Sequence, residues 1–313
     1  MGIKSGVKVS VIMNCLNEER NIRQAIDSVF NQTFKDWEIV FWDNGSTDKS
    51  AEIAKSYGEK VRYFFSEQTF PLGKARNLCI DKAKGEFIAF LDCDDIWFPQ
   101  KLEKQIPLFE KDLDVGLVFS DAIYFGEKGE ICQIFQKFKP PRGNIFSCLL
   151  RKYFICMTSV VIRRSAIENT ALFDERLRYC EDANLIFKLA YKFKLDYCDE
   201  PLVKYYVSVD SRSLKYFAVL AQERDMTLQA LRKEFPDIDE KFSEDIKIFQ
   251  AKTNAQKAIN EWTSGHSSRA RSIIKLIHPK NPLIYALYLI TFLPRSTFKI
   301  LFILNYRIKS WVN

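Results

Sequence analysis

Short apolar runs alternate with longer amphipathic segments over the first 120 residues of the chain. Four apolar runs predict strands at 7–13, 38–42, 61–65 and 87–91. The segments between them predict helices at 17–31, 48–57 and 73–83. Strands and helices that alternate over short connections form a mostly parallel sheet with helices on its faces. The runs EIVFW and FIAFL read as near-continuous apolar runs, which is typical of strands buried on both faces.

The second half of the chain is less regular. Its pattern predicts strands at 115–124 and 157–163, an extended segment at 197–207, and helices at 183–192, 214–235 and 238–262. Two further apolar stretches follow, at 283–293 and 300–304. We therefore expect four parts in the chain, which are residues 1–120, residues 121–213, a helical extension at 214–262 and a tail at 263–313.

Charge and histidine are both concentrated in the tail. The formal net charge is +7, yet the residues from Thr263 onward include eight Lys or Arg and no Asp or Glu. The body is therefore close to neutral, which argues against a nucleic-acid partner. The only two histidines are His266 and His278. A Ser-His-Asp triad, a Cys-His dyad or a His-based zinc site in the body is thereby excluded, and any general base there is expected to be a carboxylate.

The eight cysteines are scattered and form no CxxC pair. This spacing argues against a zinc ribbon or a thioredoxin-like site. The first residues, MGIKSGVKVSVIM, alternate apolar and polar positions as a strand does, so we expect no signal peptide. In that setting the expected state of the cysteines is reduced cytosolic thiols.

Polar residues follow three of the predicted strands directly. The segment 14–17 follows the first strand, 43–46 follows the second, and Asp92, Asp94 and Asp95 follow the fourth. Ligands of open α/β sheets bind outside the carboxyl ends of the strands. We therefore expect these three groups to converge on one ligand site at that edge of the sheet.

The D-x-D pattern in this site suggests a metal ion. On an extended backbone Asp92 and Asp94 point to the same side, because side chains alternate with a period of two. Two hard oxygen ligands suit Mg²⁺ or Mn²⁺, with water and phosphate completing the coordination. The alternative is an Asp-rich turn in which Asp95 caps a following helix.

Four motifs in the right order resemble the nucleotide-binding half of family 2 glycosyltransferases over about residues 7–120. They are N-C-L-N-E at 14–18, D-N-G-S-T-D at 43–48, G-K-A-R-N at 73–77 and L-D-C-D-D at 91–95. The resemblance implies the GT-A fold, which is a Rossmann-like, mostly parallel α/β sheet. It also implies an inverting, metal-dependent hexosyltransferase of the bacterial or archaeal glycan-biosynthesis type. On this basis residues 1–120 would bind a nucleotide-diphosphate sugar, with a UDP-sugar favoured, and residues 121–213 would bind the acceptor.

The resemblance also implies a role for individual residues. Asp43 would contact the nucleotide base, and Asn14, Asn17 and Ser46 would line the adjoining wall. Arg76 would lie near the nucleotide, and Asp92 would contact the ribose. Asp94, with Asp92 beside it, would bind the metal. The alternatives are turn chemistry for Asp43 and Ser46 and a solvated helical charge for Arg76. Family members commonly have Asp where Asn44 stands and Pro or Thr near Cys15. These two differences affect which nucleotide base the site is expected to prefer.

The segment YCEDANLIFKLA at 179–190 is similar to the family's E-D motif, which precedes a helix in the acceptor half. The resemblance makes Asp182 the base that deprotonates the acceptor hydroxyl and Glu181 a neighbour that orients it. The alternative is a pair of carboxylates that interact with a helix dipole. A later family segment often reads Tyr-Arg-x-His, but this chain has Ser208 in place of the histidine, with Asp210 and Arg212 nearby as other candidates. We expect Trp97 to be a core residue rather than a sugar contact.

The tail has apolar stretches that are too short to cross a bilayer, since a spanning helix needs about 20 residues. Joining residues 283–293 to 298–306 would place Pro294, Arg295 and Lys299 in mid-membrane, at high cost. We expect an amphipathic segment on the inner, anionic face of the cell membrane, and hence a cytoplasmic, peripherally bound enzyme. A helix pair packed on the body is the alternative. A membrane location fits a lipid-linked glycan as the acceptor.

Three other functions fit parts of this pattern. Transfer to a polyprenyl phosphate would need no base, because that acceptor is already ionised. A sugar-phosphate nucleotidyltransferase shares a similar sheet, but its Gly-rich N-terminal phosphate loop is missing here. An inactive, membrane-bound scaffold that binds nucleotide sugars would not need the D-x-D and E-D pairs.

Overall fold

The computed structural model of the chain describes residues 6–127, 129–136, 138–170, 172–207, 217–277 and 282–294. The chain divides into two compact units. The first, which we call the sheet unit, falls within residues 1–145 and 155–210. The second, which we call the helical unit, falls within residues 146–154 and 211–313.

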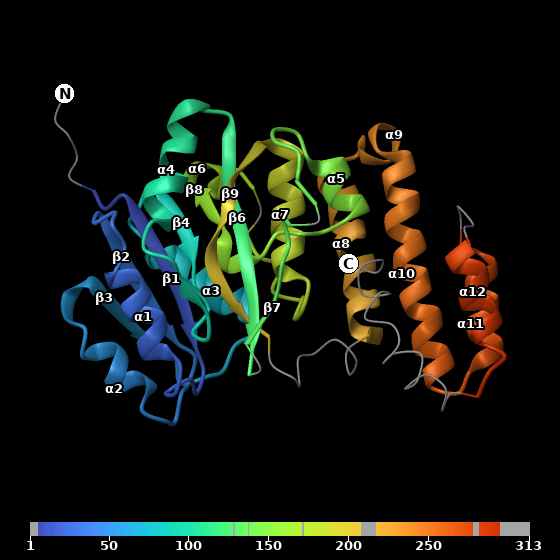
Figure 1. The fold of residues 1–313 in the computed structure, drawn as a ribbon, viewed down its shortest axis with the longest axis horizontal. Coiled ribbons are helices and arrows are strands. Elements are labelled where there is room, and N and C mark those ends of the chain that lie inside the picture. The colour runs from blue at the N-terminus through green and yellow to red at the C-terminus, as the bar shows by residue number, and fades with distance from the viewer. Residues whose placement is uncertain are drawn as a thin grey trace. The chain divides into compact units, whose positions relative to one another are not determined.

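The sheet unit is built on one nine-stranded sheet (Figure 1). Its strands are β1 (Val9–Cys15), β2 (Trp37–Asp43), β3 (Val61–Phe65), β4 (Phe87–Phe90), β5 (Ile96–Trp97), β6 (Val115–Gly126), β7 (Gly129–Gln133), β8 (Val161–Arg163) and β9 (Lys194–Tyr206). They lie in the order β3-β2-β1-β4-β8-β6-β9-β5, and β7 pairs with β6. The first four strands of that order are parallel, as the sequence predicts. Antiparallel pairs are confined to the second half of the sheet.

Helices flank this sheet. They are α1 (Ile22–Phe30), α2 (Ser50–Lys55), α3 (Leu72–Lys82), α4 (Lys101–Lys111), α6 (Arg164–Glu168) and α7 (Glu181–Lys192), with short 3₁₀ turns η1 (Gly58–Lys60) and η2 (Met157–Ser159). The apolar face of α1 packs into the same core as the inner positions of β1 and β2. Burial of this face stabilises the helix more than its intrinsic propensity does.

Two predicted elements of the sheet unit begin four or more residues later than expected. The helix predicted at 17–31 begins only at Ile22, because Asn17 adopts a left-handed conformation with φ 58° and residues 16–21 form a loop. The strand predicted at 157–163 begins at Val161, because residues 157–159 form the 3₁₀ turn η2. In both places side-chain and turn hydrogen bonds override the local hydrophobic pattern.

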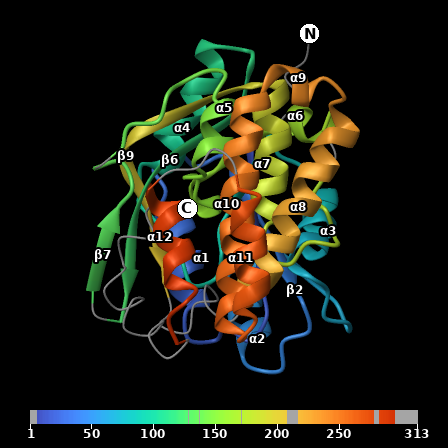
Figure 2. The ribbon, with the colours of Figure 1, turned by 90° about the vertical axis from the view of Figure 1, so that its right-hand side faces the viewer.

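The helical unit contains α5 (Phe146–Arg151), α8 (Phe217–Glu234), α9 (Ile238–Lys241), α10 (Ser243–Thr263), α11 (Ser267–Lys275) and α12 (Pro282–Ile290). Figure 2 shows α8, α10 and α11 running alongside one another. The single helix predicted at 238–262 is wrong, because the chain breaks at Phe242, whose φ is −128° and ψ is 29°. No Gly or Pro marks this break in the sequence.

The described part of the tail is a helix pair packed within this unit. Trp262 on α10 lies in a small apolar core with Ile274 and Ile284, and its indole N–H donates to the Leu293 carbonyl at 3.2 Å. This matches the packed-helix alternative for residues up to 294, and residues 295–313 lie outside the described residues. No helix within the described ranges is long and apolar enough to cross a membrane.

Candidate functional site

The loop after β1 is fastened to the turn after β2 through Asn17. Its backbone N–H donates to Ser46 Oγ at 3.1 Å, and its side-chain Oδ1 accepts from the Thr47 N–H at 2.8 Å. Next to it, the Glu19 N–H donates to Asp48 Oδ2 at 2.9 Å. The structure therefore brings Asn17 and Ser46 together, as predicted, in a cross-linked rim at the carboxyl ends of β1 and β2.

Asp43 lies fully buried beneath this rim. Its Oδ1 accepts from the Ser46 N–H at 2.7 Å, and its Oδ2 accepts from the Tyr63 hydroxyl at 2.6 Å. Burial, followed by the hydrogen bond to Asp43, raises the pKa of Tyr63. The expected turn chemistry of Asp43 is thus present. Sequence reasoning missed Tyr63, although it occupies the neighbouring parallel strand, where it pairs in register with Phe41.

Asn44 has a specific reason to be an amide. Its Nδ2 donates to the Phe70 carbonyl at 2.8 Å, and its Oδ1 accepts from the Phe70 N–H at 3.0 Å. An aspartate could make only the second of these bonds. Asn44, where family members commonly have Asp, therefore pairs with both the N–H and the carbonyl of Phe70 in a neighbouring loop.

Asn14 lies at the end of β1, partly exposed at the same edge of the sheet. Its buried Nδ2 has no hydrogen-bond partner among the described residues. A buried amide nitrogen without a partner costs free energy, typically about 1–3 kcal/mol. It is thus a donor that a ligand at this edge can satisfy.

The D-x-D segment is a turn rather than the extended backbone that the sequence suggested. Strand β4 ends at Phe90, and the Asp95 N–H donates to the Asp92 carbonyl at 3.1 Å. Asp92 and Asp94 remain partly exposed, while Asp95 is buried. The expectation that their common direction follows from the strand period is therefore wrong, although both carboxylates do reach the carboxyl edge of the sheet.

Asp95 does not cap a helix, because β5 and not a helix follows it. Its Oδ1 instead accepts from the Tyr206 N–H at the end of β9, at 2.8 Å. Burial, then the nearby Asp92 and Asp94, raise the pKa of Asp95 well above its ordinary value. Trp97 is a core residue, as expected, and its indole N–H donates to the Thr158 carbonyl at 3.0 Å.

The chemistry of Asp92 and Asp94 fits a divalent metal bound together with a diphosphate. Carboxylate oxygens are the ligands that Mg²⁺ and Mn²⁺ prefer, and Mg²⁺ commonly takes one or two carboxylates from the protein, with waters and substrate phosphates. Across the described residues, no three Asp, Glu, His or Cys side chains gather closely enough to hold an ion alone. The two carboxylates would therefore hold a metal only together with further ligands, such as water and a bound phosphate.

Arg76 joins the two carboxylate motifs. It extends from α3, and its Nη2 lies 2.9 Å from Asp92 Oδ1 while its Nη1 lies 3.2 Å from Glu181 Oε1. Burial opposes its charge, but Asp92, Glu181 and Asp182 together raise the pKa of Arg76. Its guanidinium is not the solvated helical charge of the alternative, since only 3% of the residue is exposed.

The other residues of the G-x-A-R-N motif hold the same junction. Asn77 donates to the Phe173 carbonyl at 3.0 Å and accepts from the Phe173 N–H at 3.1 Å. A side chain at Gly73 would meet Phe173 and Glu181 at 3.4–3.5 Å. The motif therefore positions the segment that precedes α7 against α3.

Glu181 and Asp182 open helix α7. Burial, followed by the charge of Asp182, raises the pKa of Glu181 to about 7. Burial likewise raises the pKa of Asp182, which remains partly exposed and whose Oδ1 accepts from the Ala183 N–H at 2.6 Å. Carboxylates with raised pKa values are candidates for proton transfer, and of these two only Asp182 is partly exposed. Their place at a helix N-terminus also agrees with the dipole alternative.

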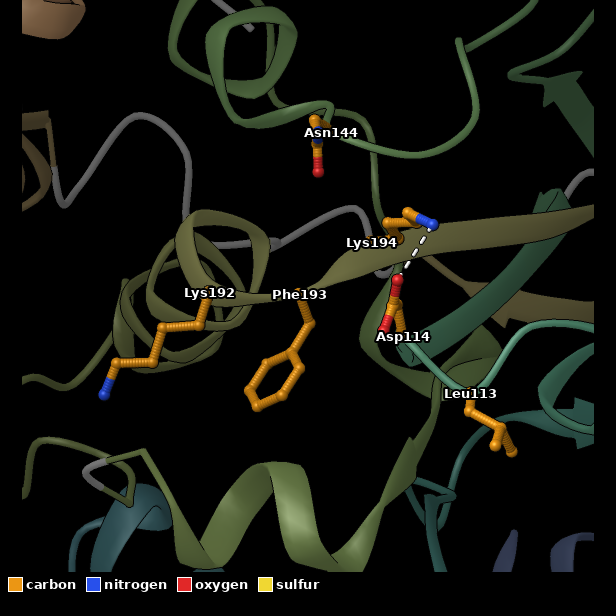
Figure 3. A pocket seen from close by; sticks show the side chains of 6 residues that line it. All are labelled: Leu113, Asp114, Asn144, Lys192, Phe193 and Lys194. Atoms are coloured by element: carbon orange, nitrogen blue, oxygen red, sulfur yellow. Dashed lines mark ion pairs between the residues drawn. The ribbon is translucent and has the colours of Figure 1, made fainter.

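A separate hollow lies at the opposite edge of the sheet (Figure 3). It holds about 310 Å³ and is lined by Leu113, Asp114, Asn144, Lys192, Phe193 and Lys194. Lys194 pairs with both Asp112 and Asp114 at 3.0 Å. The hollow lies at the start of β9 and just before β6, away from the carboxyl ends of the strands where Asp92 and Arg76 meet. This hollow therefore contains none of the residues predicted to act.

Ser208, Asp210 and Arg212, which were candidates to replace the family histidine, lie outside the described residues.

Comparisons with known sequences agree with the motifs. The family model described as glycosyl transferase family 2 matches residues 10–170, just over half of the chain. An uncharacterized glycosyltransferase of Methanocaldococcus jannaschii is 32% identical over 203 residues, which are 63% of this chain and 70% of that protein. The UDP-Glc:alpha-D-GlcNAc-diphosphoundecaprenol beta-1,3-glucosyltransferase of Escherichia coli is 31% identical over 160 residues, which are 51% of this chain and 61% of that protein.

Comparisons with solved structures agree on the fold. S. aureus TarS in complex with UDP-GlcNAc has a TM-score of 0.62 at 18% identity, over 90% of this chain and 83% of that one. A mannosyltransferase of Pyrobaculum calidifontis in complex with GDP-Man and Mn²⁺ has a TM-score of 0.60 at 16% identity, over 97% of this chain and 83% of that one. At these identities the likeness shows the fold, and it confirms the GT-A prediction.

Proposed function

The chain belongs to glycosyltransferase family 2, and from this premise we propose that it moves a sugar from a nucleotide-diphosphate sugar to a hydroxyl of a lipid-linked glycan, inverting the anomeric carbon with the help of a divalent metal. The observation that carries the proposal is the bridge made by Arg76. One guanidinium contacts Asp92 at 2.9 Å and Glu181 at 3.2 Å. This shared contact supports the proposal that the carboxylates expected to bind the donor and those expected to activate the acceptor belong to one site.

In this proposal the donor lies over the carboxyl ends of β1, β2 and β4. The rim formed by Asn17 and Ser46, with Asp43 beneath it, faces the base, and Asn14 adds an amide donor that has no partner among the described residues. Asp92 faces the ribose. We propose a UDP-sugar, because the E. coli relative and the S. aureus structure both carry UDP-sugars in their names, although the GDP-Man of the archaeal structure shows that this fold accepts another base.

Asp94, with Asp92, would hold Mg²⁺ or Mn²⁺ against the diphosphate. A metal bound there supplies positive charge that stabilises the departing nucleoside diphosphate. Arg76 keeps Asp92 in place and balances the negative charge of Glu181 behind it. The partly exposed carboxylates of Asp92 and Asp94 would thereby face the ligand, while the buried Glu181 stays paired with Arg76.

On the acceptor side, Asp182 would take the proton of the attacking hydroxyl. Its partial exposure gives the acceptor access, and its raised pKa makes it a better base than an ordinary aspartate. The hydrogen bond from the Ala183 N–H fixes its orientation, and Glu181 is held by Arg76 beside it. Because one hydroxyl displaces the diphosphate in a single step, the configuration at the anomeric carbon inverts.

The lipid-linked acceptor is supported by the E. coli relative, whose name specifies a diphosphoundecaprenol-linked sugar. The described tail has exposed basic residues on α11, namely Arg269 and Lys275, and exposed apolar side chains on α12, namely Tyr285 and Leu289. Such a combination favours an anionic membrane surface. We propose that residues 1–120 bind the donor and 121–213 the acceptor, that 214–262 form a helical extension, and that the tail at 263–313 associates with the membrane.

Calorimetry would test the donor site. UDP, GDP, dTDP and CDP would each be titrated with Mn²⁺ and with EDTA into the wild-type chain, into Asp94→Ala and into a control, Asp81→Ala. Asp81 is a highly exposed carboxylate at the far end of α3. We expect metal-dependent binding of one nucleotide, retained in the control and lost in Asp94→Ala. If the folded wild-type protein binds none of them, the donor site is wrong.

The Asp182→Asn variant separates the acceptor classes. An uncharged hydroxyl needs a base, so turnover should fall about a hundredfold or more while nucleotide binding persists. If turnover is unchanged, an acceptor that is already ionised, such as a polyprenyl phosphate, explains the activity better. Nucleotide binding without any turnover in the wild-type chain would favour the inactive scaffold.

A further inference from the structure

Two tyrosines lie next to each other near the carboxyl ends of β6 and β9. Tyr124 and Tyr205 are partners in the register of these parallel strands. Their ring centroids are 5.1 Å apart, and the ring planes meet at 56°. Both rings pack against the apolar core of the sheet unit, yet both residues remain partly exposed. Neither has a role in the sugar transfer described above.

The backbone on both sides of Tyr205 is fastened to the D-x-D segment. Lys204 pairs with Ile96, where β5 and β9 run antiparallel. The Tyr206 N–H donates to Asp95 Oδ1 at 2.8 Å, and Asp95 is the last residue of the D-x-D turn. Tyr205 therefore lies beside the turn whose carboxylates are expected to bind the diphosphate end of the donor.

Carboxylates of both motifs also act on the Tyr205 hydroxyl. Burial is the largest influence that raises the pKa of Tyr205, followed by Cys156 and then by the charges of Asp95, Asp92 and Asp182. Because electrostatic interactions weaken with distance, a group that responds to both Asp92 and Asp182 lies near both. The hydroxyl stays protonated at neutral pH, so it is available as a hydrogen-bond donor.

The place of the transferred sugar follows from the proposed function, on which this inference rests. The diphosphate lies at Asp92 and Asp94, and the acceptor hydroxyl lies at Asp182. In a direct displacement the anomeric carbon is held between the leaving oxygen and the attacking oxygen. A side chain near both Asp92 and Asp182 therefore lies beside the sugar, which makes Tyr205 a candidate to contact it.

We propose that Tyr205 is a specificity residue whose hydroxyl donates a hydrogen bond to a hydroxyl group of the transferred sugar. Tyr124 positions it, because contact between the two rings restricts how the Tyr205 ring can turn. The bond from Tyr206 to Asp95 holds the end of β9 against the turn and so fixes the distance from the ring to the donor. Tyr205 thus contacts the sugar, whereas the nucleotide lies over β1, β2 and β4.

This contact predicts a difference between two ligands of the same site. UDP has no sugar, so Tyr205→Phe should bind UDP as the wild type does. The variant should bind a UDP-sugar about three- to tenfold more weakly, because one hydrogen bond between neutral groups is lost. UDP, UDP-glucose and UDP-GlcNAc would be titrated with Mn²⁺ into the full chain by calorimetry, and GDP and GDP-mannose would be titrated in the same way.

Tyr197→Phe is a matched control on the same strand. Tyr197 lies near the start of β9, whereas Tyr205 lies near its end, and its ring stacks on Phe119 at 5.5 Å. This variant should bind the nucleotide and the nucleotide sugar like the wild type. Since Tyr205→Phe keeps the aromatic ring, we expect it to fold. A purely structural role for Tyr205 would weaken the binding of UDP and of the UDP-sugar alike.

Deoxy donors identify the hydroxyl group that Tyr205 contacts. The donor that lacks this hydroxyl has already lost the bond, so Tyr205→Phe should not weaken its binding further. Every other deoxy donor should bind the variant more weakly than the wild type.

Three results would overturn the proposal. They are a Tyr205→Phe variant that binds the UDP-sugar as tightly as the wild type, an equal loss of affinity for UDP, and the same loss with every deoxy donor. A folded wild-type chain that binds none of these nucleotides, with or without a sugar, contradicts the proposed function and this inference with it.

Discussion

Replacing Arg76 by lysine changes the bridge between the two carboxylate motifs while keeping its positive charge. The guanidinium reaches Asp92 with one nitrogen and Glu181 with another, at 2.9 and 3.2 Å. A lysine has a single ammonium group and cannot reproduce this fork. One of the two carboxylates therefore loses its partner in the variant.

The size of the loss follows from burial. Removing one partner of a buried ion pair typically costs about 3–5 kcal/mol. The Asp92 side chain is 33% exposed, so water compensates much of its share, whereas only 6% of the Glu181 side chain is exposed. Protonation of Glu181, whose pKa is raised to about 7, limits the cost further. We expect Arg76→Lys to lower the free energy of unfolding by about 2 kcal/mol.

The effect on turnover should be larger than the stability loss suggests. If Arg76 positions Glu181 and Asp182 relative to the donor, a small displacement costs about a hundredfold in rate. Urea unfolding and kcat would be measured on Arg76→Lys and on Arg62→Lys. Arg62 is a matched control, because it pairs with the buried Glu38 at 2.8 Å outside the site. A folded Arg76→Lys variant with the kcat of the wild type would refute the positioning role.

Three further changes have expected outcomes. Burial lowers the pKa of Lys101 from 10.5 to about 7; because the folded state then binds fewer protons than the unfolded state, stability should rise from about pH 7 to pH 10. In urea unfolding, Lys101→Met should remove this rise and increase the free energy of unfolding by about 2–4 kcal/mol at pH 7. The same pH dependence in the wild type and in Lys101→Met would contradict this prediction. Asn44→Asp should lower the free energy of unfolding by about 1–3 kcal/mol, because the N–H that donates to the Phe70 carbonyl is lost. An unchanged urea midpoint would contradict this prediction. Asp182→Asn should lower kcat and leave the nucleotide Kd within a few-fold of the wild-type value. Loss of nucleotide binding together with turnover would disprove this prediction.

The parallel half of the sheet was predictable from the sequence because its signals are local. Near-continuous apolar runs, such as the one within β2 at Trp37–Asp43, are typical of strands buried on both faces. The helical period likewise identified the buried face of α1. The candidate residues at the carboxyl edge followed from the position of each strand end, and the structure brings Asn17, Ser46 and Asp43 together there.

The connections between distant residues were not predictable, because no local pattern encodes them. Arg76 looked like a nucleotide contact or a surface charge, and its partner Glu181 lies 105 positions away in the chain. Asp95 looked like a helix cap, but its partner is the backbone of Tyr206. The helix predicted from residue 17 failed for the same reason, since Asn17 bonds to Thr47 rather than to its own helix.

Release of nucleoside diphosphate tests the central claim most directly, namely that the donor and acceptor carboxylates form one site for sugar transfer. The wild-type chain, Asp94→Ala and Asp182→Asn would be given UDP-glucose, UDP-GlcNAc or GDP-mannose with Mn²⁺ and a diphosphoundecaprenol-linked GlcNAc. We predict that the wild type consumes one donor only with metal and acceptor present, and that both variants lose at least a hundredfold in rate. Full release of the nucleotide by either folded variant would contradict the account.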